Sequence, residues 1–108
     1  MTVKCSTVVV TGAAGLIGSA VTRLLIAKNI NVIACDNFSI GEWRSSCELL
    51  VWEQLDISSP EFVDRLASYK IDVVVHCAAH PGGLSLREPV KDVQVNALGS
   101  MRLFEWCA

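Results

Sequence analysis

Charged residues are scarce in this 108-residue sequence, and neither sign is in large excess. They make up 19% of the residues and leave a formal net charge of −2. A nucleic-acid-binding surface needs a concentration of Lys and Arg, so the composition argues against nucleic acid and against an anionic membrane surface as partners. No apolar run reaches the roughly 20 residues that a membrane-spanning helix needs. We therefore expect neither a nucleic-acid-binding nor a membrane-spanning protein.

The cysteines lack the spacing of a metal site. They are Cys5, Cys35, Cys47, Cys77 and Cys107. None forms the Cys-x-x-Cys or Cys/His pattern that binds zinc, and most stand in or next to apolar runs, where a free cysteine behaves as a small hydrophobic side chain. Met1 to Cys5 also lack the apolar stretch and cleavage site of a signal peptide. We predict reduced structural thiols, no metal site and a cytoplasmic location.

Apolar residues are abundant, at 52% of the sequence, and they gather in short runs that alternate with helical patterns. The runs predict strands over residues 7–10, 30–35, 49–55 and 71–75. Alternation of strands and helices is typical of a parallel sheet with helices on both faces. At this length, residues 1–108 are expected to form one α/β domain.

Three helices are predicted from apolar residues spaced three and four positions apart. The first begins at Leu16 and ends near Asn29, which can adopt the left-handed conformation that closes a helix. The second starts at Ser59-Pro60-Glu61, where Ser can cap free amides and Pro suits the first turn. Pro81-Gly82-Gly83 is expected to be a loop before the third. The expected buried faces comprise Ile17, Ala20, Val21, Leu24 and Leu25; Phe62, Val63 and Leu66; and Val90, Val93, Ala97, Met101 and Phe104.

A glycine-rich turn, Thr11-Gly12-Ala13-Ala14-Gly15-Leu16-Ile17-Gly18, separates the first strand from the first helix. In this setting the first glycine permits a tight turn, the second lets the backbone approach a pyrophosphate, and the third lets the helix pack closely on the sheet. The free amides at the helix start favour an anion. No Lys-Ser/Thr pair follows, which disfavours a nucleotide-triphosphatase loop. The turn predicts a Rossmann-type parallel sheet, truncated at four strands in the order 3-2-1-4.

An acidic residue ends the second strand. Asp36 lies 18 positions after Gly18, close to the spacing of about 20 expected of the acid that binds the adenosine ribose. A carboxylate accepts ribose hydroxyls and repels a 2′-phosphate, so Asp36 favours NAD over NADP. Arg44 lies in the loop where a 2′-phosphate would sit, and we interpret it as a solvated charge. The alternative for Asp36 is a solvated carboxylate that binds no ligand.

Five motifs, in this order, resemble those of the extended short-chain dehydrogenase/reductase family, which includes the sugar-nucleotide epimerases and dehydratases. They are TGxxGxxG at residues 11–18, DNxSxG at 36–41, an Asp-hydrophobic pair at 56–57, H-x-A-A at 76–79, and a helix similar to P…NxxGT…LxE over 89–105. The resemblance covers essentially the whole chain. It implies the NAD-binding part of an NAD-dependent nucleotide-sugar epimerase or dehydratase, in which the sugar passes through a 4-keto form.

The resemblance also implies roles for individual residues. The pyrophosphate of NAD would be approached by Gly12, Gly15, Leu16, Ile17 and Gly18, and the adenosine ribose by Asp36 and Asn37. The adenine would be approached by Asp56 and Ile57, and the nicotinamide half by Cys77, Ala78, Ala79 and Asn96. Two alternatives stay open: Asp56 could cap the following turn, and Asn96 could bond only to backbone. We interpret Cys77 as part of a wall and His76 as a strand-end residue satisfied by backbone.

The catalytic Tyr-x-x-x-Lys pair of that family does not occur in the sequence. In the family the Tyr is the general base while NAD takes a hydride. The only tyrosine, Tyr69, has Val73 four positions later. We therefore expect no catalytic residue and no turnover from this chain alone. A nucleotide sugar is the expected substrate of the complete enzyme, and a homodimer or larger assembly is expected. An NADP-dependent reductase and a dinucleotide-sensing module without chemistry remain alternatives.

Overall fold

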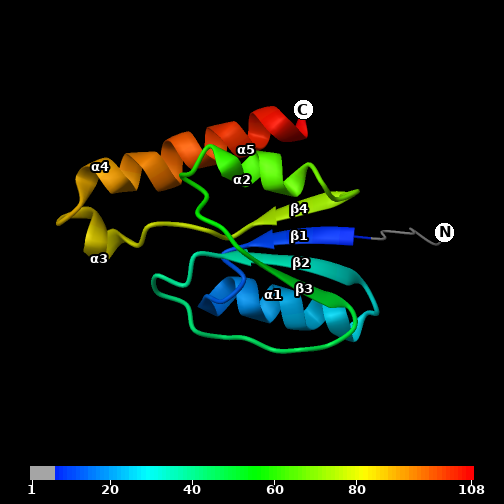
Figure 1. Ribbon diagram of the computed structural model, residues 1–108. Coiled ribbons are helices and arrows are strands. Elements are labelled where there is room, and N and C mark those ends of the chain that lie inside the picture. Colours follow the sequence, from blue (N-terminus) through cyan, green and yellow to red (C-terminus); the bar gives the residue numbers. More distant parts are fainter. Residues whose placement is uncertain (1–6) are drawn as a thin grey trace.

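The computed structural model describes residues 7–108, which form a parallel four-stranded sheet with helices on both faces (Figure 1). The strands are β1 (Thr7–Thr11), β2 (Asn31–Asp36), β3 (Leu50–Gln54) and β4 (Val73–His76). Their order across the sheet is β3-β2-β1-β4. The predicted strand order and Rossmann-type fold are confirmed, and the strands lie close to their predicted ranges.

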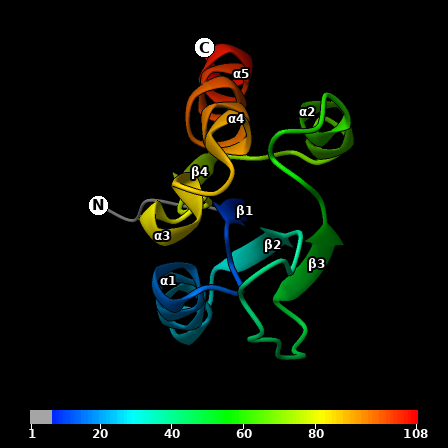
Figure 2. The same ribbon diagram turned by 90° about the vertical axis from the view of Figure 1, so that its left-hand side faces the viewer.

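The helices divide between the two faces of the sheet. Figure 2 shows α1 (Leu16–Ala27) on one face, with α2 (Glu61–Leu66) and the last helical stretch on the other. That stretch runs without a break through α4 (Pro89–Asp92), the π-helical η1 (Val93–Gly99) and α5 (Ser100–Cys107). The short helix α3 (Gly82–Ser85) stands where a loop was predicted, because the carbonyl of Pro81 accepts the amides of Leu84 and Ser85 and closes a helical turn.

Side chains of β1 and β2 alternate between two apolar clusters, one on each face of the sheet. The cluster beside α1 contains Val8, Val10, Ala13, Val32, Ala34 and Leu50. The cluster beneath α2 and α5 contains Val9, Ile33, Cys35, Ile57, Phe62, Leu66, Val95 and Leu103. The two central strands are therefore buried on both faces, which is why they read as continuous apolar runs.

The buried face of α1 differs from the predicted one. Ile17 and Leu24 are 69% and 57% exposed, and Ala20 is exposed as well. The buried residues are Gly18, Ser19 and Thr22, with Val21 and Leu25 at the margin. Gly18 explains the rotation of the helix: a Cβ added to it would lie 2.0 Å from the carbonyl oxygen of Gly12. Only glycine allows this contact, so Gly18 must face the sheet.

The last helical stretch also buries a different face. The residues predicted to be buried there are all exposed: Val90, Val93, Ala97, Met101 and Phe104. Val95, Gly99 and Leu103 face the core instead. A Cβ added to Gly99 would lie 3.0 Å from the carbonyl oxygen of Ile57, so the face that contains this glycine lies closest to the rest of the domain, and the more apolar face that the prediction chose lies outside.

Two predicted helix ends are confirmed. Asn29 has a φ of 61°, the left-handed conformation, and the amide of Ile30 donates to the carbonyl of Leu25 at 3.1 Å. This bond satisfies a carbonyl that the end of α1 would leave free. Before α2, the hydroxyl of Ser59 accepts the amide of Glu61 at 3.3 Å and donates to its carboxylate at 2.9 Å.

Glu53, on β3, is a buried carboxylate with two hydrogen-bond donors. The Nε of Arg65 donates to it at 3.0 Å, and the hydroxyl of Tyr69 donates at 2.5 Å. The hydrogen bond from Arg65 is the main cause that lowers the pKa of Glu53. The hydrogen bond to Glu53 raises the pKa of Tyr69. The carboxylate therefore links β3 to α2 and to the segment that follows it.

Acid should destabilise the fold partly through Glu53. Because its pKa is lower in the folded than in the unfolded chain, the ionised carboxylate stabilises the fold above the unfolded pKa, and this contribution is lost as the pH falls through the folded pKa. In Glu53→Gln, the free energy of unfolding should fall less between about pH 6 and about pH 3 than in the wild type. Urea unfolding at each pH measures this. Glu48→Gln, at an exposed loop position, should behave as the wild type. Equal pH dependence in Glu53→Gln would contradict the prediction.

β4 forms one edge of the sheet, with β1 as its neighbour in the described residues. Val73, Val74 and Val75 include neither the Pro nor the Lys that commonly protects an edge strand. Val73 is 46% exposed, whereas Val74 packs against the core cluster beneath α5. The unpaired side of β4 is therefore a place where a second strand can add.

We expect the 108-residue chain to self-associate by pairing two β4 strands about a two-fold axis, which makes the paired strands antiparallel. Val73→Lys should lower the apparent mass in light scattering over a concentration series, because a charged lysine on an edge strand opposes the addition of a second strand. Leu86→Lys adds the same charge at an apolar residue that is 90% exposed and outside the strand, so it should associate as the wild type does. A monomeric wild type at high concentration would refute the pairing.

Candidate functional site

A cavity of about 210 Å³ lies at the carboxyl ends of the strands. Its walls come from the glycine-rich turn, the loop after β2, the segment after β3, the segment after β4, and the last helical stretch. In open parallel sheets, ligands bind at this end, where the strand order reverses. Here the chain passes from β1 to β2 on one side and returns to β4 on the other, so the cavity lies at such a reversal.

Most of the residues predicted to bind the cofactor line this cavity: Gly12, Gly15, Asp36, Asn37, Ile57, Cys77, Ala78 and Ala79. The others do not: Leu16, Ile17, Gly18, Asp56 and Asn96. The side chains of Leu16 and Ile17 point to solvent. Any role of these two residues in binding therefore falls to their backbone amides at the start of α1.

Gly12 shapes the turn at the centre of the cavity. It has a φ of +65°, which side chains other than glycine rarely permit. A Cβ added there would lie 2.7 Å from the amide nitrogen of Ala78. The backbone of the segment after β4 therefore touches the backbone of the glycine-rich turn. Because no side chain lies between them, these two walls of the cavity have a fixed separation.

Asp36 holds two backbone segments as well as lining the cavity. One carboxylate oxygen, Oδ2, accepts the amide of Ala14 at 2.9 Å, and Oδ1 accepts the amide of Phe38 at 2.8 Å. A carboxylate offers about four acceptor positions. Two backbone bonds therefore leave capacity for the hydroxyls of a ribose.

The Thr11 side chain joins the ends of β1 and β4. Its hydroxyl oxygen accepts the amides of Cys77 at 3.0 Å and Ala78 at 3.1 Å, and it lies 2.6 Å from Nδ1 of His76. Having accepted two amides, the hydroxyl gives its own hydrogen to Nδ1, which places the imidazole proton on Nε2. Nε2 then donates to Oγ of Ser100 at 2.8 Å. Burial lowers the pKa of His76, in agreement with a neutral ring. The prediction that backbone satisfies His76 is wrong.

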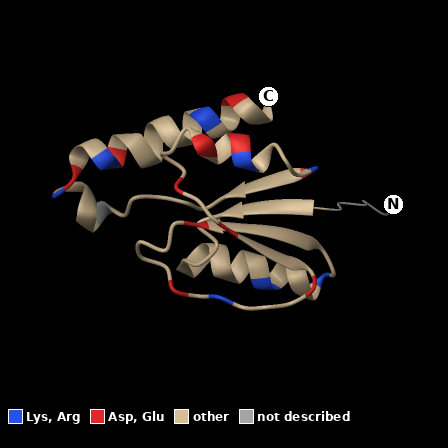
Figure 3. Ribbon diagram, viewed as in Figure 1, with Lys and Arg blue, Asp and Glu red and all other residues tan. Residues whose placement is uncertain are grey.

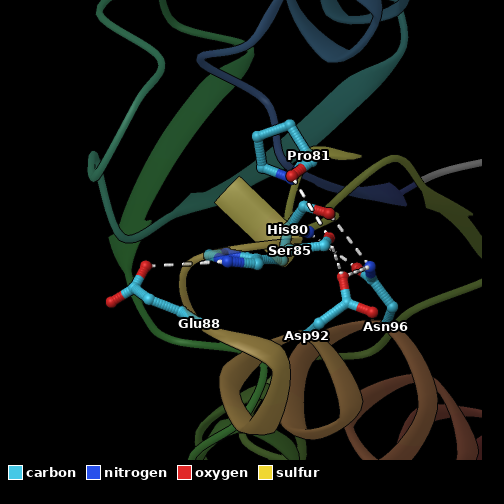
Figure 4. Close-up of polar contacts among 6 residues, drawn as sticks. All are labelled: His80, Pro81, Ser85, Glu88, Asp92 and Asn96. Atoms are coloured by element: carbon cyan, nitrogen blue, oxygen red, sulfur yellow. Dashed lines mark hydrogen bonds and ion pairs between the residues drawn. The ribbon is translucent and has the colours of Figure 1, made fainter. Parts of the chain in front are cut away.

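Asp56 and Asn96 both make structural hydrogen bonds. Asp56 Oδ1 accepts the amide and the hydroxyl of Ser58, at 2.9 and 2.7 Å, and so closes the turn after β3. Asn96 accepts the amide of His80 at 2.6 Å and donates to its carbonyl at 3.0 Å (Figure 4). Asn96 therefore fastens the segment after β4 to the last helical stretch. Contact of either residue with a cofactor stays a prediction.

Two titratable residues that line the cavity were not singled out in the sequence, His80 and Lys91. His80 is 6% exposed, and its Nε2 has no hydrogen-bond partner among the described residues, although it lies 3.6 Å from a carboxylate oxygen of Glu88 (Figure 4). Lys91 is half-buried and stands on α4. Only the position of Lys91 in the sequence could have indicated a role in the site, because it follows Pro89 at the start of the helix that was expected to contain Asn96.

The thiols and the tyrosine offer no reactive group in this cavity. Burial raises the pKa of the Cys77 thiol, which agrees with its interpretation as a wall, since the thiolate is the reactive form. Burial also raises the pKa of Cys35, to about 12. Tyr69 bonds to Glu53 and does not line the cavity. Met1 to Cys5, the segment that lacks the features of a signal peptide, lies outside the described residues.

Residues 7–108 contain neither a metal-ligand cluster nor a membrane-spanning helix. That range contains no group of three or more His, Cys, Asp or Glu residues arranged to hold a metal ion. No helix within it has both the length and the apolar character required to cross a bilayer.

Comparison with known proteins identifies the family. The family model for NAD dependent epimerases and dehydratases matches residues 8–108. The chain belongs to the NAD dependent epimerase/dehydratase family. The resemblance seen in the sequence motifs is thereby confirmed, and the family's cofactor is NAD.

The relatives of this family member include UDP-glucose 4-epimerases. One from Mycolicibacterium smegmatis is 32% identical over 102 residues, which cover 89% of this chain and 33% of the relative. The solved structure of the Thermus thermophilus enzyme in complex with NAD has a TM-score of 0.84 and 33% identity over 94% of this chain and 33% of that one. An epimerase from Methanothermobacter thermautotrophicus has a TM-score of 0.87 and 35% identity, covering 94% and 31%. The chain spans about a third of the length of these relatives.

Thr11→Val should loosen the cavity wall and destabilise the domain. Valine has nearly the same shape but leaves the amide of Ala78 without its acceptor and the amide of Cys77 with only the Thr11 carbonyl, at a cost of about 1–3 kcal/mol in the free energy of unfolding. Chemical denaturation measures the loss. Thr11→Ser keeps the hydroxyl and serves as the control. If Thr11→Val is as stable as Thr11→Ser, the hydroxyl does not tie the strands together.

Proposed function

We propose that this chain is the NAD-binding part of an NAD-dependent epimerase or dehydratase that acts on a nucleotide sugar. One observation carries the proposal: the glycine-rich turn, Asp36 and the segment after β4 meet in one cavity at the carboxyl ends of the strands. The family match and the NAD complex of the Thermus thermophilus relative support it. In the complete enzyme, bound NAD would accept and return a hydride from the sugar, which supplies the redox chemistry.

The residues present fit the parts of NAD. Gly15 caps α1, whose first amides have no acceptor within the helix and whose first turn contains no acidic residue. These amides and the positive end of the helix suit the pyrophosphate. Asp36 and Asn37 suit the adenosine ribose, and Ile57 suits the adenine. The cavity of about 210 Å³ is smaller than the roughly 300 Å³ at which enclosed ligand sites begin, so this chain would cover only part of the cofactor.

The geometry of the loop after β2 favours NAD over NADP. With the adenosine ribose bound at Asp36 as proposed, the carboxylate would repel a 2′-phosphate. The Arg44 guanidinium stacks on the ring of Phe38, 3.9 Å from its centroid, and forms no ion pair with Asp36 among the described residues. This arrangement argues against the NADP-dependent reductase. A cofactor-sensing module would keep the same cavity, and it differs from the enzyme in needing no general base.

Titration calorimetry with the two cofactors tests the proposal. The wild type should bind NAD at least about tenfold more tightly than NADP, because hydrogen bonds from a ribose to a charged group contribute about 1.5–3 kcal/mol and a phosphate is repelled. Asp36→Asn should weaken NAD binding on the order of tenfold and narrow the difference between the cofactors. Asn is preferred to Ala at this position because its side-chain oxygen can still accept a hydrogen bond from a backbone amide.

Asp64→Asn is the matched control, since it removes the same charge from an exposed position on α2. It should bind both cofactors as the wild type does. Equal or tighter binding of NADP by the wild type would show that the assignment of Asp36 is incorrect.

A further inference from the structure

The cavity contains one strong cation. Lys91 is the only Lys or Arg among its lining residues, and it is half-buried. Figure 3 shows the blue segment of α4 at the end of the molecule where the strand arrows point, with red acidic segments on either side of it along the chain. A lysine that lines a cavity and is partly withdrawn from water needs a compensating anion more than a fully solvated lysine does.

The described residues supply no such anion to Lys91. The ion pairs among residues 7–108 join Arg65 to Glu53 and His80 to Glu88. The two acids nearest to Lys91 in the sequence bond to other residues. Glu88 faces His80, and Asp92 accepts hydrogen bonds from Ser85 and from Asn96, the latter at 2.8 Å (Figure 4). The ammonium group is therefore left for a ligand.

We propose that Lys91 binds the diphosphate of the dinucleotide, which deepens the proposed function and rests on it. The glycine-rich turn approaches the cavity from the α1 side, and α4 lies across the carboxyl ends of the strands from α1 (Figures 1 and 2). The start of a helix supplies about half a positive charge. A diphosphate carries two negative charges, so a full charge from the facing wall improves the match. Lys91 is thus a binding residue for the cofactor, outside the motifs that the sequence revealed.

Binding of three ligands to the 108-residue chain tests this role. NAD and ADP-ribose both contain the diphosphate, whereas adenosine does not. Lys91→Gln should weaken binding of NAD and ADP-ribose about tenfold, the effect of losing one charge-assisted contact, and leave adenosine unchanged. The affinity of the variant for NAD should also depend less on salt concentration. Lys91→Arg should restore most of the loss.

Lys28→Gln is the matched control, because it removes the same charge at an exposed position beyond α1. It should bind every ligand as the wild type does. Thermal unfolding of each variant shows whether the fold is intact, and Lys91→Arg keeps the test valid if Lys91→Gln is unstable.

Three outcomes would overturn the inference. If the wild type binds NAD and Lys91→Gln binds it equally well, the lysine does not contact the cofactor while the proposed function stands. If Lys91→Gln weakens adenosine binding as much as NAD binding, the lysine does not act through the diphosphate. If the wild type binds neither NAD nor ADP-ribose, the proposed function fails together with the inference.

Discussion

The site depends on backbone approaching backbone at the glycine-rich turn. Gly18 brings α1 against the carbonyl of Gly12, and Gly12 in turn lies against the amide of Ala78. Three segments from different parts of the sequence therefore meet with no side chain between them. Interiors pack at nearly crystalline density, so such contacts leave little freedom to rotate or slide. This contact sets the rotation of α1 and the distance between β1 and the segment after β4, and with them the shape of the cavity.

Polar side chains then hold each wall in place. Asp36 bonds to the turn through Ala14, Thr11 bonds to the segment after β4, and Asn96 bonds to both polar groups of the His80 backbone. Each of these bonds ends on backbone, which fixes the course of the chain more firmly than contacts between mobile side chains. A cavity built in this way loses little conformational freedom when a ligand binds, and that lowers the free-energy cost of association.

The sequence was sufficient to predict the arrangement of the strands and most of the residues that it grouped around one cavity. The apolar runs, the spacing of Gly12, Gly15 and Gly18, and Asp36 at the end of β2 all follow local rules that the structure obeys. The predicted faces of α1 and of the last helical stretch were wrong because hydrophobic periodicity does not register the close backbone approaches at Gly18 and Gly99. Lys91 and His80 were missed because only the tertiary fold brings α4 and the segment after β4 to the cavity.

Asp36 also constrains how this site could change during evolution. Replacing Asp36 with a basic residue, which would attract a 2′-phosphate, would remove the acceptor that now serves the amides of Ala14 and Phe38. The glycine-rich turn would lose a hydrogen bond at the moment when cofactor preference shifted. A lineage that exchanges its dinucleotide must therefore first acquire a substitute acceptor for these amides. With the role proposed for Asp36, one carboxylate couples fold stability to cofactor choice, and single-step intermediates would be selected against.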